Sequence, residues 1–327
     1  MGLMLGISGV GSMASLFAAK LALTTPNGQQ RPIVIGNWAE QIRAINIRGI
    51  LLTHLDGKRE RVAVKAITPI DAPKLDVLLI LNKSWQTARV ASDLAHCMSP
   101  DSLILTLQNG LGNDCVLRQR MESTVLQGIT TEAANRPAIG RVIHAGAGNT
   151  LIPNAIHPYA KSLYARLNRA GLATRFCSDA NVAIWNKLLI NLAINPVTAL
   201  FDLRNGEVLQ QPQVLAIACA AAREAASLAQ FLGIEVTSNI EAQIVNVCAA
   251  TSENVSSMLQ DVRADRPTEI ESLCGAIVKL AQEHHLEVPL NNALYELLLA
   301  GNKEIRSKEE LLNELLSKIG DGAYEGV

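Results

Sequence analysis

The sequence lacks an excess of either charge, clustered metal ligands and closely paired cysteines. Lys and Arg number 29 against 30 Asp and Glu, so there is no basic surplus to bind the phosphate backbone of a nucleic acid. None of the six cysteines forms a CxxC pair, and Cys and His are not clustered as a zinc site requires. We therefore expect reduced thiols, no metal and no nucleic acid partner.

Long apolar runs are also missing. The first residues, MGLMLGISGVGS, carry no basic segment ahead of an apolar one, as a secretory signal would. No segment approaches the roughly 20 uninterrupted apolar residues of a membrane span. The sequence thus predicts a soluble, cytoplasmic protein that does not bind a membrane.

Two domains are expected from the length of 327 residues and from a change of pattern near residue 180. In the first part, short apolar runs alternate with helical patterns, which is typical of parallel βαβ units in a sheet covered on both faces. The expected strands cover residues 3–5, 32–35, 76–81, 102–107 and 124–129, and the expected helices cover 12–23, 40–47 and 87–98. Residues 131–153 have a hairpin pattern with glycines at the turns.

The second part is rich in Ala, Leu and Glu and is expected to be all-helical. Its helices are expected to break at Pro196, Pro212, Pro267 and Pro289. We therefore divide the chain into an α/β domain, 1–179, and a helical domain, 180–327. The glycine-rich end, 320–327, is expected to fray.

A glycine-rich turn lies between the first expected strand and the helix after it. Gly6, Ser8, Gly9 and Gly11 occupy the region where a dinucleotide fingerprint places glycines, which permit a tight turn and close approach of a pyrophosphate. If the fingerprint is aligned as Gly6-x-Ser8-x-x-Gly11, the helix begins directly at its last glycine. The alternative alignment is Gly9-x-Gly11-x-x-Ala14. A purely structural turn is the competing interpretation, which the position at the start of a βαβ pattern disfavours.

Asn37 follows the second expected strand. An acidic residue there would bind the adenosine ribose of NADH, and a basic residue would favour the 2′-phosphate of NADPH. Asn37 is neither, although its amide can hydrogen-bond a ribose hydroxyl, and Arg43, nearby in the sequence, is a candidate to reach a phosphate. The residues alone do not decide whether the cofactor is NADPH or NADH.

Lys83 and Asn109 each follow an expected strand. The carboxyl ends of strands in an open α/β sheet are where ligands bind. A solvated lysine and an ordinary Asn-Gly turn are the structural alternatives. Two polar groups at the same edge of one sheet favour a cofactor cleft.

Lys187, Asn191 and Asn195 recur every four residues and so share one face of an otherwise apolar helix. The alternative is that this face simply contacts water. A polar strip this narrow suits the wall of a cleft better than an open surface, so we favour a functional role.

Glu269 follows Pro267, where a new helix is expected to begin with Asp265 as a candidate N-cap. Glu269 would then lie in the first turn, where carboxylates are common because they stabilise the helix dipole. From the residues alone, its role is undecided.

Together these motifs resemble the ketopantoate reductase (2-dehydropantoate 2-reductase) family over essentially the whole chain. The resemblance rests on the glycine turn, NKSWQ at 82–86, QNG at 108–110, WNKLLINLAINPVT at 185–198 and ENVSSMLQDVRADRPTE at 253–269. It implies a Rossmann-type dinucleotide-binding domain at 1–179. It also implies an all-helical domain at 180–327, like that of 6-phosphogluconate dehydrogenase, for substrate binding and dimerisation.

The resemblance also implies roles for individual residues. Lys187 is implied as the catalytic lysine and Glu269 as the carboxylate beside it. The implied substrate-binding residues are Asn191, Asn195, Asn254 and Ser257. The expected cofactor-binding residues are Gly6, Ser8, Gly9, Gly11, Asn37, Lys83 and Asn109.

Two residues depart from the family pattern. Ser8 replaces the middle glycine of the turn, and Asn37 stands where the family usually has Arg for the 2′-phosphate. NADPH is the cofactor that the resemblance implies, and Asn37 leaves NADH as an alternative.

The implied reaction is the reduction of a 2-oxo acid, ketopantoate to pantoate, on the route to pantothenate and coenzyme A. Lys187 would protonate the carbonyl oxygen, and Glu269 would keep the ammonium charged and in place next to the nicotinamide. One alternative is a related dehydrogenase of a different 2-oxo or 3-hydroxy acid. Another is a non-catalytic dinucleotide sensor, which would not need Lys187 and Glu269 together. The helical half has enough apolar surface for a homodimer.

Overall fold

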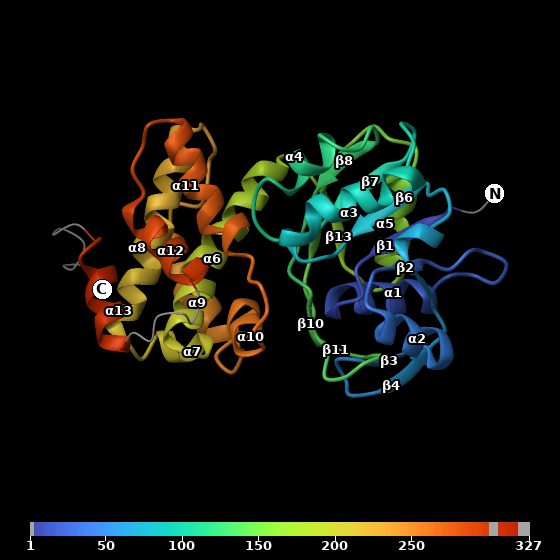
Figure 1. The fold of residues 1–327 in the computed structure, drawn as a ribbon, viewed down its shortest axis with the longest axis horizontal. Helices are drawn as coiled ribbons and strands as arrows, with labels where there is room; N and C mark the ends of the chain where they lie inside the picture. Colours follow the sequence, from blue (N-terminus) through green and yellow to red (C-terminus); the bar gives the residue numbers. More distant parts are fainter. Residues whose placement is uncertain (1–2, 301–306, 320–327) are drawn as a thin grey trace. The chain divides into compact units, whose positions relative to one another are not determined.

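The protein is described by a computed structural model that covers residues 3–300 and 307–319. The chain divides into two compact units (Figure 1). The first comprises Met1–Gln108 and Gly112–Ala180, and the second comprises Asn109–Leu111 and Asn181–Val327. A three-residue loop from the α/β part of the sequence therefore belongs to the helical unit. The glycine-rich end at 320–327 lies outside the described residues.

A parallel sheet forms the centre of the first unit, with the strand order β5-β2-β1-β6-β7-β8. Its strands are β1 (Leu5–Ser8), β2 (Ile33–Ile35), β5 (Lys65–Ile67), β6 (Val77–Ile80), β7 (Leu103–Thr106) and β8 (Thr124–Gln127). Each neighbouring pair is parallel. The order reverses at β1, so the carboxyl end of β1 is the switch point at which such sheets bind ligands. This is the Rossmann-type arrangement that the sequence predicts.

The first strand lies further along the chain than expected. It runs from Leu5 to Ser8 rather than over residues 3–5. Gly6 pairs with Ile33 of β2, and Ser8 pairs with Ile80 of β6. Gly is disfavoured in isolated strands, but here partners on both sides outweigh that weak local preference.

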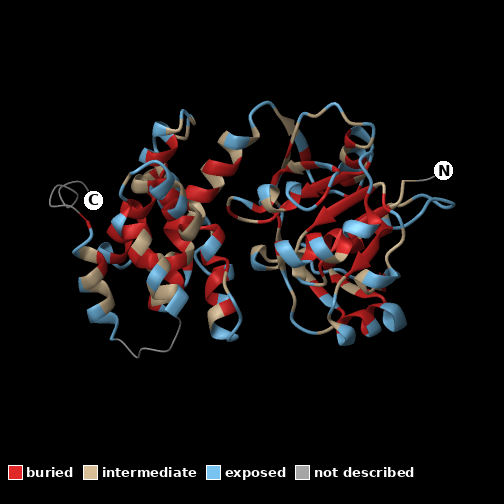
Figure 2. Ribbon diagram, turned by 45° about the horizontal axis from the view of Figure 1, so that its top comes forward, coloured by how far each residue is buried: buried red, intermediate tan, exposed pale blue. Residues whose placement is uncertain are grey.

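Apolar side chains cover both faces of the parallel sheet. The α-helices of this unit are α1 (Ser12–Leu23), α2 (Ala39–Arg48), α3 (Thr87–Leu94), α4 (Asn113–Arg118) and α5 (Ala160–Arg169). Leu5 and Ile7 of β1 pack in one cluster with α1 and α5, whereas Ile33 and Ile35 of β2 pack in another with α3. Figure 2 shows the central strands buried along their length. This double-sided burial explains why the strands are apolar at successive positions.

Two smaller sheets complete the first unit, and the sequence pattern anticipates only part of them. One has the order β10-β11-β3-β4 and the other β13-β12-β9. Their strands are β3 (Ile50–Thr53), β4 (Arg59–Val62), β9 (Ile129–Thr130), β10 (Ala133–Asn135), β11 (Arg141–Gly146), β12 (Thr150–Pro153) and β13 (Thr174–Cys177). The antiparallel β10–β11 pair falls in the expected hairpin segment. The short β3 and β4, missed from sequence, carry only partial alternation of buried positions.

The second unit is helical, as the sequence predicts. Its α-helices are α6 (Ala180–Phe201), α7 (Asn205–Val208), α8 (Pro212–Phe231), α9 (Ile240–Ala250), α10 (Ser257–Arg263), α11 (Cys274–Glu283), α12 (Pro289–Ala300) and α13 (Lys308–Leu316). By length and hydropathy alone, α6 and α8 could cross a membrane, but 72% and 61% of their most apolar windows are buried inside the protein. Such burial is typical of core helices.

Pro196 does not end a helix, contrary to expectation. It lies inside α6 with a buried side chain, and the helix continues to Phe201. A proline in a helix interior costs about 3 kcal/mol, which burial of neighbours such as Val197 helps to offset. Pro212 and Pro289 instead begin α8 and α12, where the missing N–H breaks no helical hydrogen bond.

All six cysteines are unpaired, in line with the expected reduced thiols. Burial raises the pKa of Cys219 and of Cys248 to about 11, which keeps both thiols protonated and unreactive near neutral pH. Cys115 is exposed and Cys177 is partly exposed, whereas the other four cysteines are buried. The cysteines of the helical core thus act as small apolar side chains.

Glu224 of α8 fixes the start of α12. Its Oε1 accepts a hydrogen bond from Leu290 N at 2.9 Å, and its Oε2 accepts from Asn291 N and Asn291 Nδ2, both at 2.9 Å. Burial raises the pKa of Glu224, and the bonds from Asn291 and Leu290 oppose that rise. The carboxylate satisfies amides that the first turn of a helix leaves without partners, so it joins two helices of the core.

We expect Glu224→Ala to lower the free energy of unfolding by about 2 kcal/mol, because amide donors at the start of α12 would lose their acceptor. Urea unfolding followed by circular dichroism measures this. Glu283→Ala is the control, since the exposed Glu283 only pairs with Lys279 at 4.0 Å and should contribute less than about 0.5 kcal/mol. Equal losses in both variants would contradict the role given to Glu224.

Candidate functional site

The glycine turn joins β1 to α1 at the switch point of the sheet. Gly9 has a φ of +117°, and a Cβ there would lie 3.3 Å from both Ala14 Cβ and Leu81 O. Gly11 is the N-cap of α1, no side chain caps this helix, and nothing lies within 4 Å of the position that a Gly11 Cβ would take. The turn therefore requires glycine at position 9 and leaves open space beside the first turn of α1, which fits the approach of a phosphate.

Gly6 and Ser8 lie in β1 rather than in the turn. A Cβ at Gly6 would lie 2.6 Å from Leu75 Cδ1, so packing excludes a side chain there. Ser8 is the last residue of the strand and is only 2% exposed. Because strand residues alternate, both positions lie on the opposite face from Ile7. The turn itself is Gly9-Val10-Gly11, and Gly6 and Ser8 form the strand that leads into it.

The end of β2 lies beside this turn. A Cβ at Gly36 would lie 2.7 Å from Val10 Cγ1, which shows how closely the two segments pack. Asn37 follows and is exposed, and its Nδ2 donates a hydrogen bond to Asp93 Oδ2 at 3.3 Å. The residue expected to bind the ribose thus stands next to the turn expected to hold the pyrophosphate.

Lys83 is half-buried and lies just after β6, before the short 3-10 helix η2 (Ser84–Gln86). The buried Gln108 holds this loop, because its Nε2 donates to Asn82 O at 3.1 Å and to Thr87 Oγ1 at 2.9 Å. No role for Gln108 is expected from the sequence, although it stands in the QNG motif. Its amide fixes the loop of Lys83 against the end of β7.

Lys187, Asn191 and Asn195 form a half-buried stripe on α6. Their neighbours Leu188 and Leu192 are buried in the helical core. The polar strip is therefore as narrow as the sequence pattern predicts.

Asn109 joins Lys187 to Glu269. Lys187 Nζ donates a hydrogen bond to Asn109 Oδ1 at 2.8 Å, and Asn109 Nδ2 donates to Glu269 Oε2 at 3.3 Å. Glu269 is only 6% exposed. All three residues belong to the second unit, and we call them the lysine cluster. The two candidate catalytic residues are thus connected through an amide.

The hydrogen bonds of Asn109 place its side chain in the lysine cluster, in addition to its expected place among the cofactor residues. Both ends of its amide are engaged inside the helical unit, and Leu111 N donates to Ser272 O at 2.9 Å. Gly110 has a φ of +84°, and a Cβ there would overlap Ser272 O, so only glycine fits. The sequence alone could not show this, because an Asn-Gly pair after a strand is also an ordinary turn.

The electrostatics of the cluster favour proton transfer near neutral pH. Burial lowers the pKa of Lys187 to about 8, and the Glu269 carboxylate partly opposes that fall. The ammonium form therefore predominates at pH 7, and the pKa is close to the range in which a general acid works best.

Contrary to expectation, Glu269 does not lie in the first turn of an α-helix that begins at Pro267. It precedes a short 3-10 helix, and α11 begins only at Cys274. Arg266 Nε donates to Asp261 Oδ1 at 3.1 Å, which ties the chain back to α10 just before Pro267. This connection delays the helix.

Ser257 begins α10 and Asn254 lies in the segment just before it, and both are exposed. Ser256 between them is the N-cap, and its Oγ accepts a hydrogen bond from Thr198 Oγ1 of α6 at 2.7 Å. Thr198 lies one helical turn beyond Asn195. The four residues expected to bind substrate therefore lie on two segments that this bond connects.

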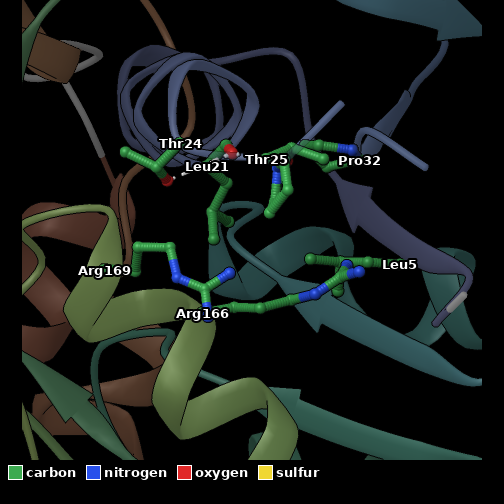
Figure 3. A pocket seen from close by; sticks show the side chains of 8 residues that line it. Leu5, Leu21, Thr24, Thr25, Pro32, Arg166 and Arg169 are labelled. Atoms are coloured by element: carbon green, nitrogen blue, oxygen red, sulfur yellow. Dashed lines mark hydrogen bonds between the residues drawn. The ribbon is translucent and has the colours of Figure 1, made fainter. Parts of the chain in front are cut away.

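A hollow at the other end of β1 is lined by none of the expected site residues. Figure 3 shows Arg166 and Arg169 of α5 facing Leu21 and Thr25 at the end of α1. Burial, and then the like charge of Arg169, lower the pKa of Arg166. Because Leu5 at this hollow begins β1 and the glycine turn follows its end, the hollow lies at the opposite edge of the sheet from the turn.

Two family models match the chain. The model described as Ketopantoate reductase PanE/ApbA matches residues 5–156, and the model described as Ketopantoate reductase PanE/ApbA C terminal matches residues 179–302. A relative from Halobacterium salinarum, named 2-dehydropantoate 2-reductase, is 32% identical over 306 residues, which cover 91% of this chain and 98% of the relative.

Solved structures have the same fold. A PanE/ApbA family ketopantoate reductase from Ralstonia eutropha JMP134 is 24% identical with a TM-score of 0.84, over 96% of this chain and 100% of that one. D-mandelate dehydrogenase with NADH and anilino(oxo)acetate is 23% identical with a TM-score of 0.83, over 95% of this chain and 100% of that one. At these identities the likeness concerns the fold alone.

We expect Glu269→Gln to lower the pKa of Lys187 below its value of about 8, because burial would then act without the opposing carboxylate. The pH dependence of lysine acylation, measured by mass spectrometry of the Lys187 peptide, reports this pKa. Glu271→Gln is the matched control, because Glu271 is exposed in the same segment. A Lys187 pKa that moves equally in both variants would contradict the coupling to Glu269.

Proposed function

Because this chain belongs to the ketopantoate reductase family, we propose that it reduces the 2-oxo acid ketopantoate to pantoate with a reduced nicotinamide cofactor. Membership makes the chain an NAD(P)H-dependent oxidoreductase. The choice of ketopantoate follows the name of the Halobacterium salinarum relative, 2-dehydropantoate 2-reductase. The lysine cluster is the structural observation that carries the proposal, because it holds a proton donor of suitable pKa beside a carboxylate.

In this proposal Lys187 is the general acid. Addition of hydride to the carbonyl carbon leaves negative charge on the carbonyl oxygen, and the Lys187 ammonium stabilises that charge and donates the proton. Glu269 favours the charged form of the lysine, and Asn109 positions its Nζ through the 2.8 Å hydrogen bond. With a pKa of about 8, the neutral amine left after the reaction regains a proton from water at pH 7.

We assign substrate binding to Asn191, Asn195, Asn254 and Ser257. Amide and hydroxyl groups can donate hydrogen bonds to the carboxylate of a 2-oxo acid, and amide oxygens can accept one from a substrate hydroxyl. Neutral donors orient the substrate without a second full charge beside the ammonium. The half-buried or exposed state of these four residues keeps their polar groups accessible.

We assign dinucleotide binding to the α/β domain, 1–179, and substrate binding to the helical domain, 180–327. The proposed cofactor residues are Gly6, Ser8, Gly9, Gly11, Asn37, Lys83 and Asn109, and the side-chain amide of Asn109 also belongs to the lysine cluster. The open space at Gly11 and the backbone of Gly9 support a pyrophosphate at the turn. When bound, the reduced nicotinamide supplies the hydride. NADPH is the proposed cofactor.

We further propose that the enzyme is cytoplasmic and forms a homodimer through its helical unit. Phe231 and Leu299, on α8 and α12, are 59% and 55% exposed, which is unusual for large apolar side chains. Contact with a second copy would remove this surface from water.

The proposed reaction is tested by initial rates with ketopantoate and a panel of other 2-oxo and 3-hydroxy acids, each with both cofactors in the appropriate redox state. We expect the highest kcat/KM with ketopantoate. A higher value for another acid would identify a related dehydrogenase. Dinucleotide binding without turnover of any acid would indicate a sensor.

We expect Lys187→Ala to reduce kcat by roughly two to four orders of magnitude, because the reaction would lose its general acid. Calorimetry should show nearly unchanged cofactor binding, because the glycine turn belongs to the other unit. Lys279→Ala is the control, since Lys279 is an exposed lysine of α11. Near wild-type kcat in Lys187→Ala would refute the assignment.

We expect kcat/KM for reduction to fall as the pH rises through about 8, because Lys187 then loses the proton that it must donate. The reverse oxidation needs the neutral amine and should rise over the same range. Both profiles can be measured with one pair of substrates. Reduction and oxidation rates that change in the same direction would be inconsistent with a single acid–base group.

A further inference from the structure

We propose that Arg136 binds the 2′-phosphate of NADPH and thereby determines the cofactor preference. The inference rests on the proposed dinucleotide site. Asn37 at the end of β2 carries no charge, so a cation for this phosphate must come from elsewhere in the fold. Arg136, in the loop between β10 and β11, lies at the end of β2, because it packs on Trp38.

The position of Arg136 is defined by Trp38. The Cζ of Arg136 lies 4.3 Å from the centroid of the Trp38 ring. Trp38 is the N-cap residue of α2 and directly follows Asn37. The guanidinium therefore lies over the residue that directly follows Asn37, whose amide is expected to bind the ribose. The 2′-phosphate is attached to that ribose, so the cation is in the region where the phosphate would be.

The loop that carries Arg136 is fixed to α2. Gly140 N donates to Gln41 Oε1 at 2.9 Å, and Leu51 N donates to Gly140 O at 2.8 Å. Next to this, β11 pairs with β3 in parallel, starting from Arg141 and Leu51. With its far end held against α2 and β3, the loop presents Arg136 in a defined place, which reduces the entropy cost of binding a ligand.

The geometry of an arginine on an indole suits phosphate binding. The guanidinium is planar, its five N–H donors lie in the plane, and stacking uses only its faces. The indole also holds the side chain through a cation–π interaction. A guanidinium held in this way can make two parallel hydrogen bonds to a phosphate, which a lysine cannot.

The charges around the end of β2 also favour a phosphate. Asp93 alone would favour a ribose hydroxyl over a phosphate, but Arg89 Nε lies 3.4 Å from its Oδ2 and offsets its charge. Glu40 and Arg43 on α2 are both exposed and of opposite sign. The carboxylates of Asp93 and Glu40 thus each have an arginine on the same helix, and Arg136 adds a cation over Trp38.

The test measures binding directly, apart from catalysis. Calorimetry would give the Kd of NADP⁺, NAD⁺, adenosine 2′,5′-bisphosphate and 5′-AMP for the wild type and for Arg136→Gln. We expect Arg136→Gln to weaken the two 2′-phosphorylated ligands about tenfold or more, as the loss of a charge-assisted hydrogen bond does. The other two ligands should change less than about twofold. The kcat/KM ratio of NADPH to NADH should fall by the same factor.

Two further variants separate this role from general effects. Arg120→Gln removes an exposed arginine that precedes β8, at the amino edge of the sheet, and should leave all four affinities unchanged. Arg136→Lys keeps the charge without the planar fork and should restore part of the lost affinity. Circular dichroism confirms that each variant is folded.

The outcomes distinguish this inference from the proposed function. If Arg136→Gln weakens all four ligands equally, or none, or if the wild type prefers NAD⁺, Arg136 is not the phosphate ligand, whatever substrate is turned over. If selective weakening occurs but no 2-oxo acid is reduced, the inference stands and the proposed reaction fails. If the wild type binds neither dinucleotide, both fail.

Discussion

The hydrogen bond from Lys187 to Asn109 is the contact on which the arrangement of the helical unit's polar residues depends. An ammonium among apolar helix residues is costly unless it has partners. Asn109 provides an acceptor, and the other end of its amide reaches the buried Glu269. This requirement accounts for a loop of the α/β sequence that belongs to the helical unit. The loop passes Ser272 at Gly110, where only a glycine lets the Ser272 backbone come so close.

Burial of Lys187 also determines how readily it gives up its proton. Enough water is excluded from Lys187 to bring its pKa to about 8, and the Glu269 carboxylate prevents a larger fall. A fully solvated lysine would hold its proton too firmly, and one without a carboxylate would lose it more readily. In the α/β unit, the glycine turn, the end of β2 and the loop before β11 are likewise brought together by packing, with Gly36 against Val10 and Gly140 against Gln41.

Much of the fold could be predicted because its signals are local. Strands buried on both faces are apolar at successive positions, and α6 shows its stripe directly through the spacing of Lys187, Asn191 and Asn195. Predictions failed where distant partners override local preference. β1 extends through Gly6 because neighbouring strands pair with it, and Pro196 is accepted inside a helix because the core surrounds it.

By itself, the sequence determined most strands of the parallel sheet and the helices beside them, the glycine turn and the polar stripe of α6, since each depends on residues a few positions apart. The tertiary structure decided which residues these features meet. Asn109 could be placed beside Lys187, and Arg136 over Trp38, only once the chain was folded, because such contacts join segments far apart in sequence and depend on the packing of everything between them.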